Sequence, residues 1–286
     1  MPSRIVTEGI AVPRCRVVLL LTCLLFASPI FESAAQQPAE PSPNTNDEFT
    51  PPEYSAWRAA EPIRIDGRLD EAAWFAAPAI RDFHFPWFEQ GEKEQTVAKL
   101  LWDDTFLYIG HICQDRFITA RHTERDGAIP KDDCFEIMVA PDSTRPNFYF
   151  NIEWNVIGGL VDNHRPEGPQ GPRVAWNAEG VQVAGHAVGT LNDDSDEDQY
   201  WVVEVAIPLS NFAHAAPHTP PRAGDMWRMN LNRHGGDTNL QYSQWSPGDT
   251  PRPAFHTPHR FGRLYFSDRL SPFSPPAENR TSNSVP

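Results

Sequence analysis

Carboxylate, amide and guanidinium side chains recur at every second position in four strand-like segments of the chain. Neighbouring side chains in a strand point to opposite faces, so residues two apart share a face. In the segment 148–156, Asn151, Glu153 and Asn155 share one face, whereas Phe150 and Ile152 lie on the other. The complete polar set that we predict for this kind of face is Glu136, Asn151, Glu153, Asn155, Glu204, Arg228 and Asn230.

A face of this composition has the chemistry to bind a sugar. Hydroxyl groups donate hydrogen bonds to carboxylates and accept them from amide and guanidinium groups, and an aromatic ring can stack on the apolar face of a pyranose. The alternative is the solvated side of an antiparallel sheet, on which pairs of Glu and Arg contribute little. The alternation fits both interpretations.

Two further classes of protein fit some of these residues. Glycoside hydrolases use two carboxylates, and Glu136, Glu153 and Glu204 fall on the predicted polar face. A haem-binding electron carrier would use Met or His ligands, which the chain contains, but the sequence has no C-x-x-C-H attachment motif and we expect no haem.

An acidic run at 192–198 (NDDSDED) offers closely spaced oxygen atoms. Asp194, Asp196 and Asp198 are therefore candidate calcium ligands, since carboxylate oxygens are the donors that Ca²⁺ prefers. The run lacks the glycine turn of an EF-hand loop, and a solvated acidic loop is the alternative.

The segments that carry the polar residues predict short strands. Strand-like runs occur at 97–102, 107–114, 134–140, 148–156, 181–188, 200–207, 227–233 and 263–266. No long amphipathic helix separates them, and 29 Pro and 17 Gly favour turns. We therefore predict an all-β fold, an antiparallel β-sandwich or jelly roll, as a single domain over residues 53–268.

The charge of the chain argues against a nucleic-acid partner. The 24 Lys and Arg stand against 38 Asp and Glu, which gives a formal net charge of −14, and no Lys- or Arg-rich run is present. Binding along phosphates needs the opposite balance.

The N-terminus resembles an export signal over residues 1–35. Arg4, Arg14 and Arg16 supply a positive region, 17–31 is apolar, and small residues precede a predicted cleavage near Ala35. The apolar stretch is shorter than the ~20 residues of a spanning helix, so we expect a secreted or periplasmic protein with no membrane span after cleavage. Residues 36–52 and 269–286 are Pro-rich and polar, and we predict a disordered linker and a disordered tail. Cys113 and Cys134 remain after export, and whether they pair is open.

Six segments together suggest a family. They are 65–74 (IDGRLDEAAW), 101–109 (LWDDTFLYI), 132–137 (DDCFEI), 203–208 (VEVAIP), 224–230 (GDMWRMN), and 245–247 (WSP) with 256–262 (HTPHRFG). In this order they resemble the family 9 carbohydrate-binding modules, in the stand-alone secreted branch whose fold is similar to DOMON domains.

The resemblance implies a β-sandwich that binds saccharides without cleaving them. In the best-known members two Trp rings clamp the reducing-end sugar of a chain, and structural calcium lies nearby. By this resemblance one clamp ring is Trp245, the acidic sugar contact is Glu136, and the amide is Asn155. The second clamp ring has no counterpart, because 129–131 is Ile-Pro-Lys, and Glu153 stands where the family has an Arg.

Other aromatic residues are candidates for the missing ring. Trp176 or Trp154 could replace it, and Trp87 and Phe88 lie in a predicted loop, although each of these rings could instead pack in the core. We therefore expect a non-catalytic protein of carbohydrate catabolism that binds a poly- or oligosaccharide and that could work beside a glycoside hydrolase.

Overall fold

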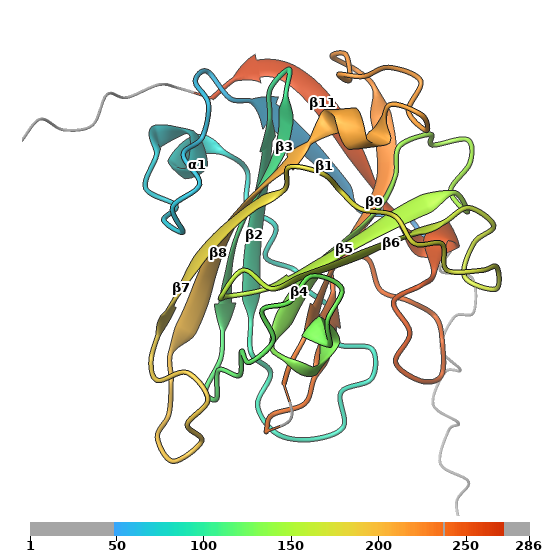
Figure 1. The fold of residues 1–286 in the computed structure, drawn as a ribbon. Helices are drawn as coiled ribbons and strands as arrows, with labels where there is room; N and C mark the ends of the chain where they lie inside the picture. Colours follow the sequence, from blue (N-terminus) through green and yellow to red (C-terminus); the bar gives the residue numbers. More distant parts are fainter. Residues whose placement is uncertain (1–48, 237, 272–286) are drawn as a thin grey trace, which may run out of the picture. The chain divides into compact units, whose positions relative to one another are not determined.

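The computed structural model describes residues 49–236 and 238–271, and these form one compact unit (Figure 1). The predicted signal peptide and most of the predicted linker and tail lie outside the described residues. The first strand begins at Glu53 and the last ends at Leu270, close to the predicted limits of 53 and 268.

Strands dominate the described part of the chain. They are β1 (Glu53–Arg58), β2 (Thr96–Trp102), β3 (Phe106–Gln114), β4 (Cys134–Ala140), β5 (Tyr149–Asn155), β6 (Leu160–Arg165), β7 (Gln182–Val188), β8 (Tyr200–Pro208), β9 (Met226–His234), β10 (Tyr242–Gln244) and β11 (Gly262–Leu270). The described helices are short: α1 (Ala72–Ala76), η1 (Ile129–Lys131), η2 (Leu209–Phe212) and η3 (Pro258–Arg260). The prediction of an all-β fold is confirmed.

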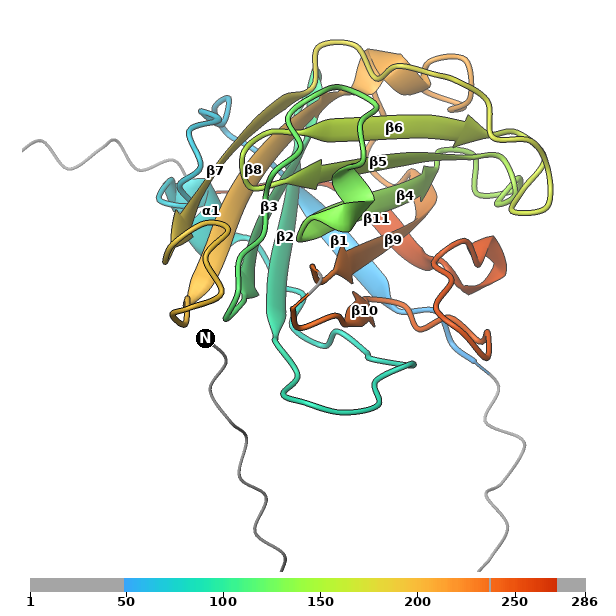
Figure 2. The same cartoon turned by 60° about the horizontal axis from the view of Figure 1, so that its bottom comes forward.

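The strands form one curled sheet in the order β6-β5-β4-β9-β11-β1-β2-β3-β8-β7, with β10 paired to β9 (Figures 1 and 2). Its two halves face each other as the layers of a sandwich, β6-β5-β4-β9 across from β2-β3-β8-β7. Most pairs are antiparallel, as predicted, but β1 lies parallel to both β2 and β11. This short strand joins the two halves at the point where the sheet curls, and its composition gave no signal of that pairing.

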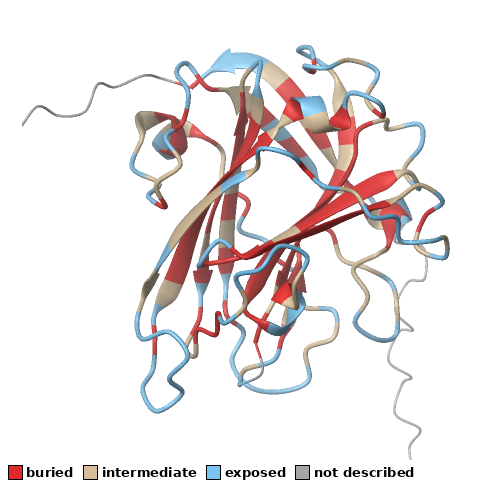
Figure 3. Ribbon diagram, viewed as in Figure 1, coloured by how far each residue is buried: buried red, intermediate tan, exposed pale blue. Residues whose placement is uncertain are grey.

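The hydrophobic core fills the space between the two layers, and many strand residues of both layers are coloured as buried in Figure 3. The predicted alternation is confirmed on all four strands for which it was predicted, including β8, where Trp201, Val203, Val205 and Ile207 are buried in this core. The inward side chains are Phe135, Ile137 and Val139 on β4, Phe150, Ile152 and Trp154 on β5, and Trp227, Met229 and Leu231 on β9, all buried. Burial of these rings and branched chains is the main favourable contribution to the fold.

An ion-pair network lies inside the sandwich. Arg233 turns inward from β9 and is 1% exposed, and its Nη2 lies 3.1 Å from Glu94 Oε2 and 3.0 Å from Asp115 Oδ2. The indole of Trp201 donates to the same Asp115 carboxylate. The guanidinium links β9 to the residues that precede β2 and follow β3, and it supplies the cation for two buried carboxylates.

The segment 65–74 is anchored on β8 by Glu204. One carboxylate oxygen accepts the backbone N–H groups of Asp66, Gly67 and Arg68, and the other accepts the indole N–H of Trp74 at 2.8 Å. Gly67 has φ of +81° and lies against Gly185 of β7, where a Cβ atom would approach the Gly185 backbone to 3.0 Å. Glycine is therefore required at this contact.

Both cysteines of the described part are buried and free. Cys113 lies on the inner face of β3 and Cys134 on the outer face of β4, so the sandwich separates them. Within residues 49–236 and 238–271, no helix has the length and apolar character needed to cross a membrane.

Candidate functional site

A row of polar side chains crosses the outer face of the β5-β4-β9-β10 layer, where Asn232 and Gln244 are 0% exposed, Glu136 is 5% exposed and Glu153 is partly exposed. The strand register places Glu153 of β5 opposite Glu136 of β4, Glu136 opposite Asn232 of β9, and Asn232 opposite Gln244 of β10. We call these four side chains the outer polar row. Alternation brings them to one face because the residues between them point into the core.

Hydrogen bonds fix the orientation of the two amides in this row. The backbone N–H of Gly248 donates to Gln244 Oε1 at 2.7 Å, and Gln244 Nε2 donates to Asn232 Oδ1 at 3.2 Å. Asn232 Nδ2 in turn donates to Glu136 Oε1 at 3.3 Å. Because this series of hydrogen bonds starts at Gly248, the loop after β10 fixes both amides so that Asn232 Nδ2 points toward Glu136.

Burial raises the pKa of both carboxyls in the outer polar row. For Glu136, burial is the largest cause, repulsion from Glu153 adds to it, and the Asn232 amide opposes it. For Glu153, burial raises the pKa to about 7, against the opposing effects of Asn151 and Arg173. The pair therefore keeps a proton at neutral pH, and it can present both a donor and acceptors to a ligand.

Next to Glu153, Asn151 of β5 lies directly opposite Asn163 of β6. Asn151 is 1% exposed and Asn163 is 2% exposed, and Asn163 Nδ2 donates to Asn151 Oδ1 at 2.8 Å. Asn151 Nδ2 and Asn163 Oδ1 have no hydrogen-bond partner within the described ranges. Buried polar atoms without a partner are rare in folded proteins, so these two mark a polar position beside Glu153 that the described part of the fold does not fully satisfy.

Aromatic rings border the outer polar row at β10. The ring of Tyr242 lies 4.7 Å from His234, 6.4 Å from Trp87 and 6.0 Å from Phe255 between centroids, and all four side chains are partly exposed. We call these four residues the aromatic rim. Tyr242 and His234 occupy the row next to Gln244 and Asn232 on the same face. Rings at the edge of a polar surface can stack on a sugar while its hydroxyls meet the polar row.

The structure brings together Glu136, Glu153 and Asn151 from the predicted set. Asn155 and Asn230 share their face, but their amides are used within the fold. Asn155 donates to Asp132 and to the His122 carbonyl, and Asn230 exchanges two hydrogen bonds with Ser246.

Two other predicted contacts lie elsewhere. Arg228 donates to the backbone carbonyls of Phe261 and Gly262. Glu204 lies in the other layer of the sandwich, where it holds the segment 65–74. The prediction that Glu204 shares a face with Glu136 was wrong, because alternation assigns a side chain to a face of its own strand and does not say in which layer that strand lies.

The two candidate stacking rings pack against the core. Trp245 is 5% exposed and belongs to the hydrophobic core, where its ring covers Gly262. It follows Gln244 directly, so when Gln244 faces outward Trp245 faces inward. Trp176 is partly buried against the inward-facing Phe150, at 4.6 Å between ring centroids, and not beside Glu136.

Glu136, Glu153 and Trp87 were candidates from the sequence, whereas five residues of the outer polar row and the aromatic rim were not: Asn232, His234, Tyr242, Gln244 and Phe255. Asn232 belongs to the same alternation as Asn230, so the pattern of 227–233 already indicated its face. Tyr242 and Gln244 lie on a three-residue strand, too short to show a period. Phe255 comes from a loop, and only the folded chain places it beside Tyr242.

The acidic run 192–198 does not gather its carboxylates around one point. Asp198 accepts backbone N–H groups of Ile118 and Thr190, Asp196 accepts the Thr190 hydroxyl, and Asp194 accepts the Thr238 hydroxyl. In the described part of the chain no group of three or more His, Cys, Asp or Glu side chains could hold a metal ion. These residues do not fit a calcium site in this arrangement, and calcium binding stays a prediction.

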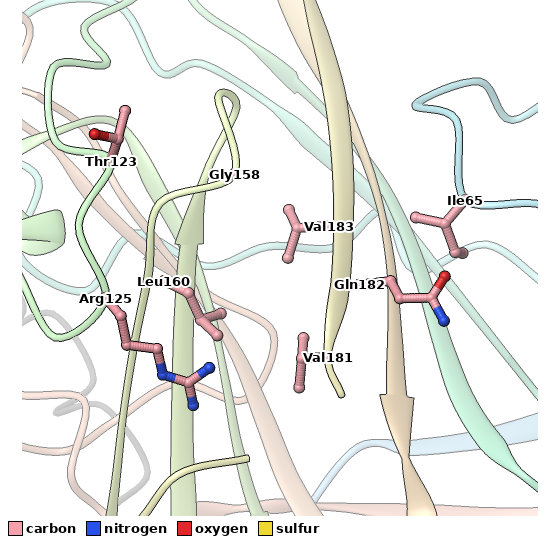
Figure 4. Close-up of a pocket in the computed structure, with 8 residues that line it drawn as sticks. All are labelled: Ile65, Thr123, Arg125, Gly158, Leu160, Val181, Gln182 and Val183. Atoms are coloured by element: carbon pink, nitrogen blue, oxygen red, sulfur yellow. The ribbon is translucent and has the colours of Figure 1, made fainter. Parts of the chain in front are cut away.

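Two pockets lie away from the outer polar row. One, of about 440 Å³, lies between Arg125 and Leu160 on one side and Val181 and Val183 on the other (Figure 4). The side chain of Gln182, which also lines it, points away from Arg125. The guanidinium of Arg125 at this pocket is already paired with Asp162. The other, of about 710 Å³, is lined by Arg58, Asp104 and the segment 217–223. Neither contains a residue of the predicted sugar-binding set, so the outer polar row with its aromatic rim is the candidate site.

Solved structures with a similar fold are carbohydrate-binding proteins. A proposed carbohydrate-binding protein from Bacteroides uniformis ATCC 8492 is 18% identical, with a TM-score of 0.63 over 76% of this chain and 100% of that one. A family 9 carbohydrate-binding module from Caldicellulosiruptor kristjanssonii in complex with cellotriose is 15% identical, with a TM-score of 0.52 over 78% of this chain and 100% of that one. The complex of such a module with glucose gives a TM-score of 0.51 at 16% identity, over 77% of this chain and 100% of that one. These likenesses show the β-sandwich fold.

Comparisons of sequence give a partial match and a family. Palmitoyltransferase ZDHHC8 of Homo sapiens and of Pan troglodytes is 34% identical over 131 residues, and this match covers 39% of the chain and 17% of either palmitoyltransferase. Because the match covers so small a share of these enzymes, it gives no indication that this chain has their activity. The model of "Carbohydrate-binding family 9" matches residues 84–266, more than half of the chain and all of its candidate site. The chain therefore belongs to carbohydrate-binding family 9.

Proposed function

We propose that this protein binds a poly- or oligosaccharide at the outer polar row and the aromatic rim, without cleaving it. The observation that carries the proposal is the adjacency of Glu136 and Glu153 to Asn232, on a face whose edge holds the partly exposed ring of Tyr242. Carboxyl and amide groups bind hydroxyls, and the ring covers an apolar sugar face.

Three sugar contacts of this proposal are Glu136, Glu153 and Asn151, and the stacking ring is Tyr242 with Trp87 or Phe255 beside it. The family 9 module of Caldicellulosiruptor kristjanssonii forms complexes with cellotriose and glucose, which supports a saccharide ligand here. We further propose that the chain acts outside the cytoplasm after removal of residues 1–35. Its role there would be to hold a carbohydrate for breakdown, beside a glycoside hydrolase.

The test is calorimetric titration of the mature chain, residues 36–286, with plant, algal and bacterial polysaccharides and with oligosaccharides such as cellotriose. Each oligosaccharide is compared with its reduced alditol. A loss of binding on reduction would indicate that the site takes the reducing end, whereas equal binding would indicate recognition along the chain. If Glu136→Gln and Tyr242→Ala bind every ligand as tightly as the natural chain, the proposed site is wrong.

A glycoside hydrolase is the second candidate, because Glu136 and Glu153 are direct cross-strand neighbours and burial raises the pKa of both. Cross-strand Cβ atoms lie about 4.5–5.5 Å apart, similar to the carboxyl separation in retaining glycosidases. Both carboxyls, however, project from one face of a sheet, whereas a glycosidase places its two carboxyls on either side of the scissile bond. We expect no release of reducing sugar from any ligand that binds; release that Glu153→Gln abolishes would favour the hydrolase.

A further inference from the structure

The fold compensates each buried carboxylate outside the outer polar row with a cation or with backbone N–H groups. Glu94 and Asp115 pair with Arg233, and Asp162 pairs with Arg125 and accepts the Ala178 N–H. The remaining carboxylates accept two or three N–H groups from the backbone: Asp132, Asp133, Asp198 and Glu204. A buried negative charge without such partners is costly, so this regularity has a physical basis.

Glu136 and Glu153 depart from this rule. Among the described residues Glu136 accepts one hydrogen bond, the long one from Asn232, and neither carboxyl takes part in an ion pair or accepts a backbone N–H. Glu136 is 5% exposed, Glu153 is partly exposed, and the register places the two residues directly opposite each other. The pair keeps a proton at neutral pH, and no cation or backbone N–H group of the described residues is bonded to the negative charge that remains, so a ligand that binds there would compensate it.

The buried amides beside the pair narrow the chemistry of that ligand. Asn151 shares a face and a strand with Glu153 and its amide lowers the pKa of that carboxyl, so its Nδ2 is a donor beside the pair. The Oδ1 of Asn163 is an acceptor without a hydrogen-bond partner among the described residues. A saccharide hydroxyl can accept a hydrogen bond from Asn151 Nδ2 and donate one to Asn163 Oδ1. A hydroxyl beside the two carboxyls would satisfy a hydrogen bond but would leave the negative charge in place. An ammonium group would supply up to three donors and a positive charge.

We propose that the site selects saccharides that carry a protonated amine, such as oligomers of 2-amino-2-deoxyglucose, with the amine between Glu136 and Glu153. The inference rests on the proposed function, because it assumes that the outer polar row is the sugar site. The ring faces of the aromatic rim favour the same ligand, since aromatic rings attract cations as well as sugar faces.

The other charged or titratable groups around the pair include Arg165, Arg173, His234, His256, Tyr149 and Cys134. Burial raises the pKa of the Cys134 thiol, which keeps it neutral. Arg173 is exposed and Arg165 lies in the row of Tyr149, two rows from Glu153 along β6. Burial lowers the pKa of His234 and of His256, which keeps both imidazoles neutral at neutral pH. The nearby histidines therefore add no positive charge that would oppose an amine at the pair, and Arg173, whose charge lowers the pKa of Glu153, is the cation that the amine would meet.

The test is calorimetric titration of the mature chain at about pH 6, where an amine of the α-amino type is protonated. Three trisaccharides that differ at the 2-position are compared: cellotriose, the β-1,4-linked glucosamine trisaccharide and its N-acetylated form. We expect the glucosamine trisaccharide to bind at least tenfold more tightly than either of the others. Glu136→Gln and Glu153→Gln should each bring the ratio of affinities for the glucosamine trisaccharide and cellotriose close to one, with cellotriose still bound.

Matched controls separate this selectivity from general attraction of a cation to an acidic chain. Glu197→Gln removes an exposed carboxylate away from the site and should leave the ratio unchanged. If cellotriose binds and the glucosamine trisaccharide binds no more tightly, the inference is overturned and the proposed function stands. Equal affinity for trilysine would also overturn it, and the absence of binding by all three sugars would contradict both proposals.

Discussion

Replacing Glu153 by Gln should stabilise the protein at neutral and alkaline pH but not at acidic pH. In the folded chain burial raises the pKa of Glu153 to about 7 from an ordinary value of 4.5. Between these two pH values the folded state holds a proton that the unfolded state has released, so the free energy of unfolding falls as the pH rises. A pKa difference of about 2.5, at about 1.4 kcal/mol for each pKa unit, corresponds to about 3 kcal/mol.

A glutamine at position 153 does not ionise and therefore escapes this loss. The difference in unfolding free energy between the variant and the natural chain should be close to zero below about pH 4.5 and should grow to about 3 kcal/mol above about pH 7. Loss of the repulsion between the two carboxyls acts in the same direction.

Urea unfolding followed by tryptophan fluorescence measures this difference at pH 5, 6, 7 and 8, and the nine Trp residues give an ample signal. Glu197→Gln, the same substitution at an exposed site, should stay within about 0.5 kcal/mol of the natural chain at every pH. A stabilisation by Glu153→Gln that does not change with pH would refute the reasoning, because it would mean that ionisation of this carboxyl is not what destabilises the fold.

Three further predictions concern other residues. Tyr242→Ala should weaken oligosaccharide binding by about 1–3 kcal/mol in calorimetry with little change in stability, whereas Trp245→Ala should lower the unfolding free energy by about 3–5 kcal/mol, because its ring lies in the core. Arg233→Met should lower the unfolding free energy by about 3–5 kcal/mol in urea, since Glu94 and Asp115 would stay buried without their cation; a loss below about 1 kcal/mol would contradict this role. The glucosamine trisaccharide should release protons on binding at about pH 6, because the ammonium replaces the proton of the acid pair, and cellotriose should not; calorimetry in buffers of different ionisation enthalpy measures the difference.

Alternation along the strands predicted much of the candidate site. The period of two on β4 and β5 placed Glu136, Asn151 and Glu153 on one face, because burial of Phe135, Ile152 and Trp154 forces their neighbours outward. It could not distinguish a side chain that is free for a ligand from one that the fold uses. Asn230 has the same pattern as Asn232, yet Ser246 takes both ends of its amide.

What the sequence could not predict depends on contacts between distant segments. Arg233 is buried because Glu94 and Asp115, more than 100 residues away along the chain, reach it through the sandwich. Glu204 resembles Glu136 in its strand, but the segment 65–74 folds over it. The aromatic rim joins Trp87 of a loop to Phe255 of another loop, at 5.9 Å between centroids, and no local pattern marks that meeting.

The central claim is that the outer polar row and the aromatic rim bind the saccharide, and a crystal structure of the mature chain with a bound oligosaccharide tests it most directly. We expect sugar hydroxyls within hydrogen-bond distance of Glu136, Glu153 and Asn151, and a pyranose ring against Tyr242. A sugar bound instead in the pocket of Arg125 and Gln182, with the outer polar row empty, would contradict the account.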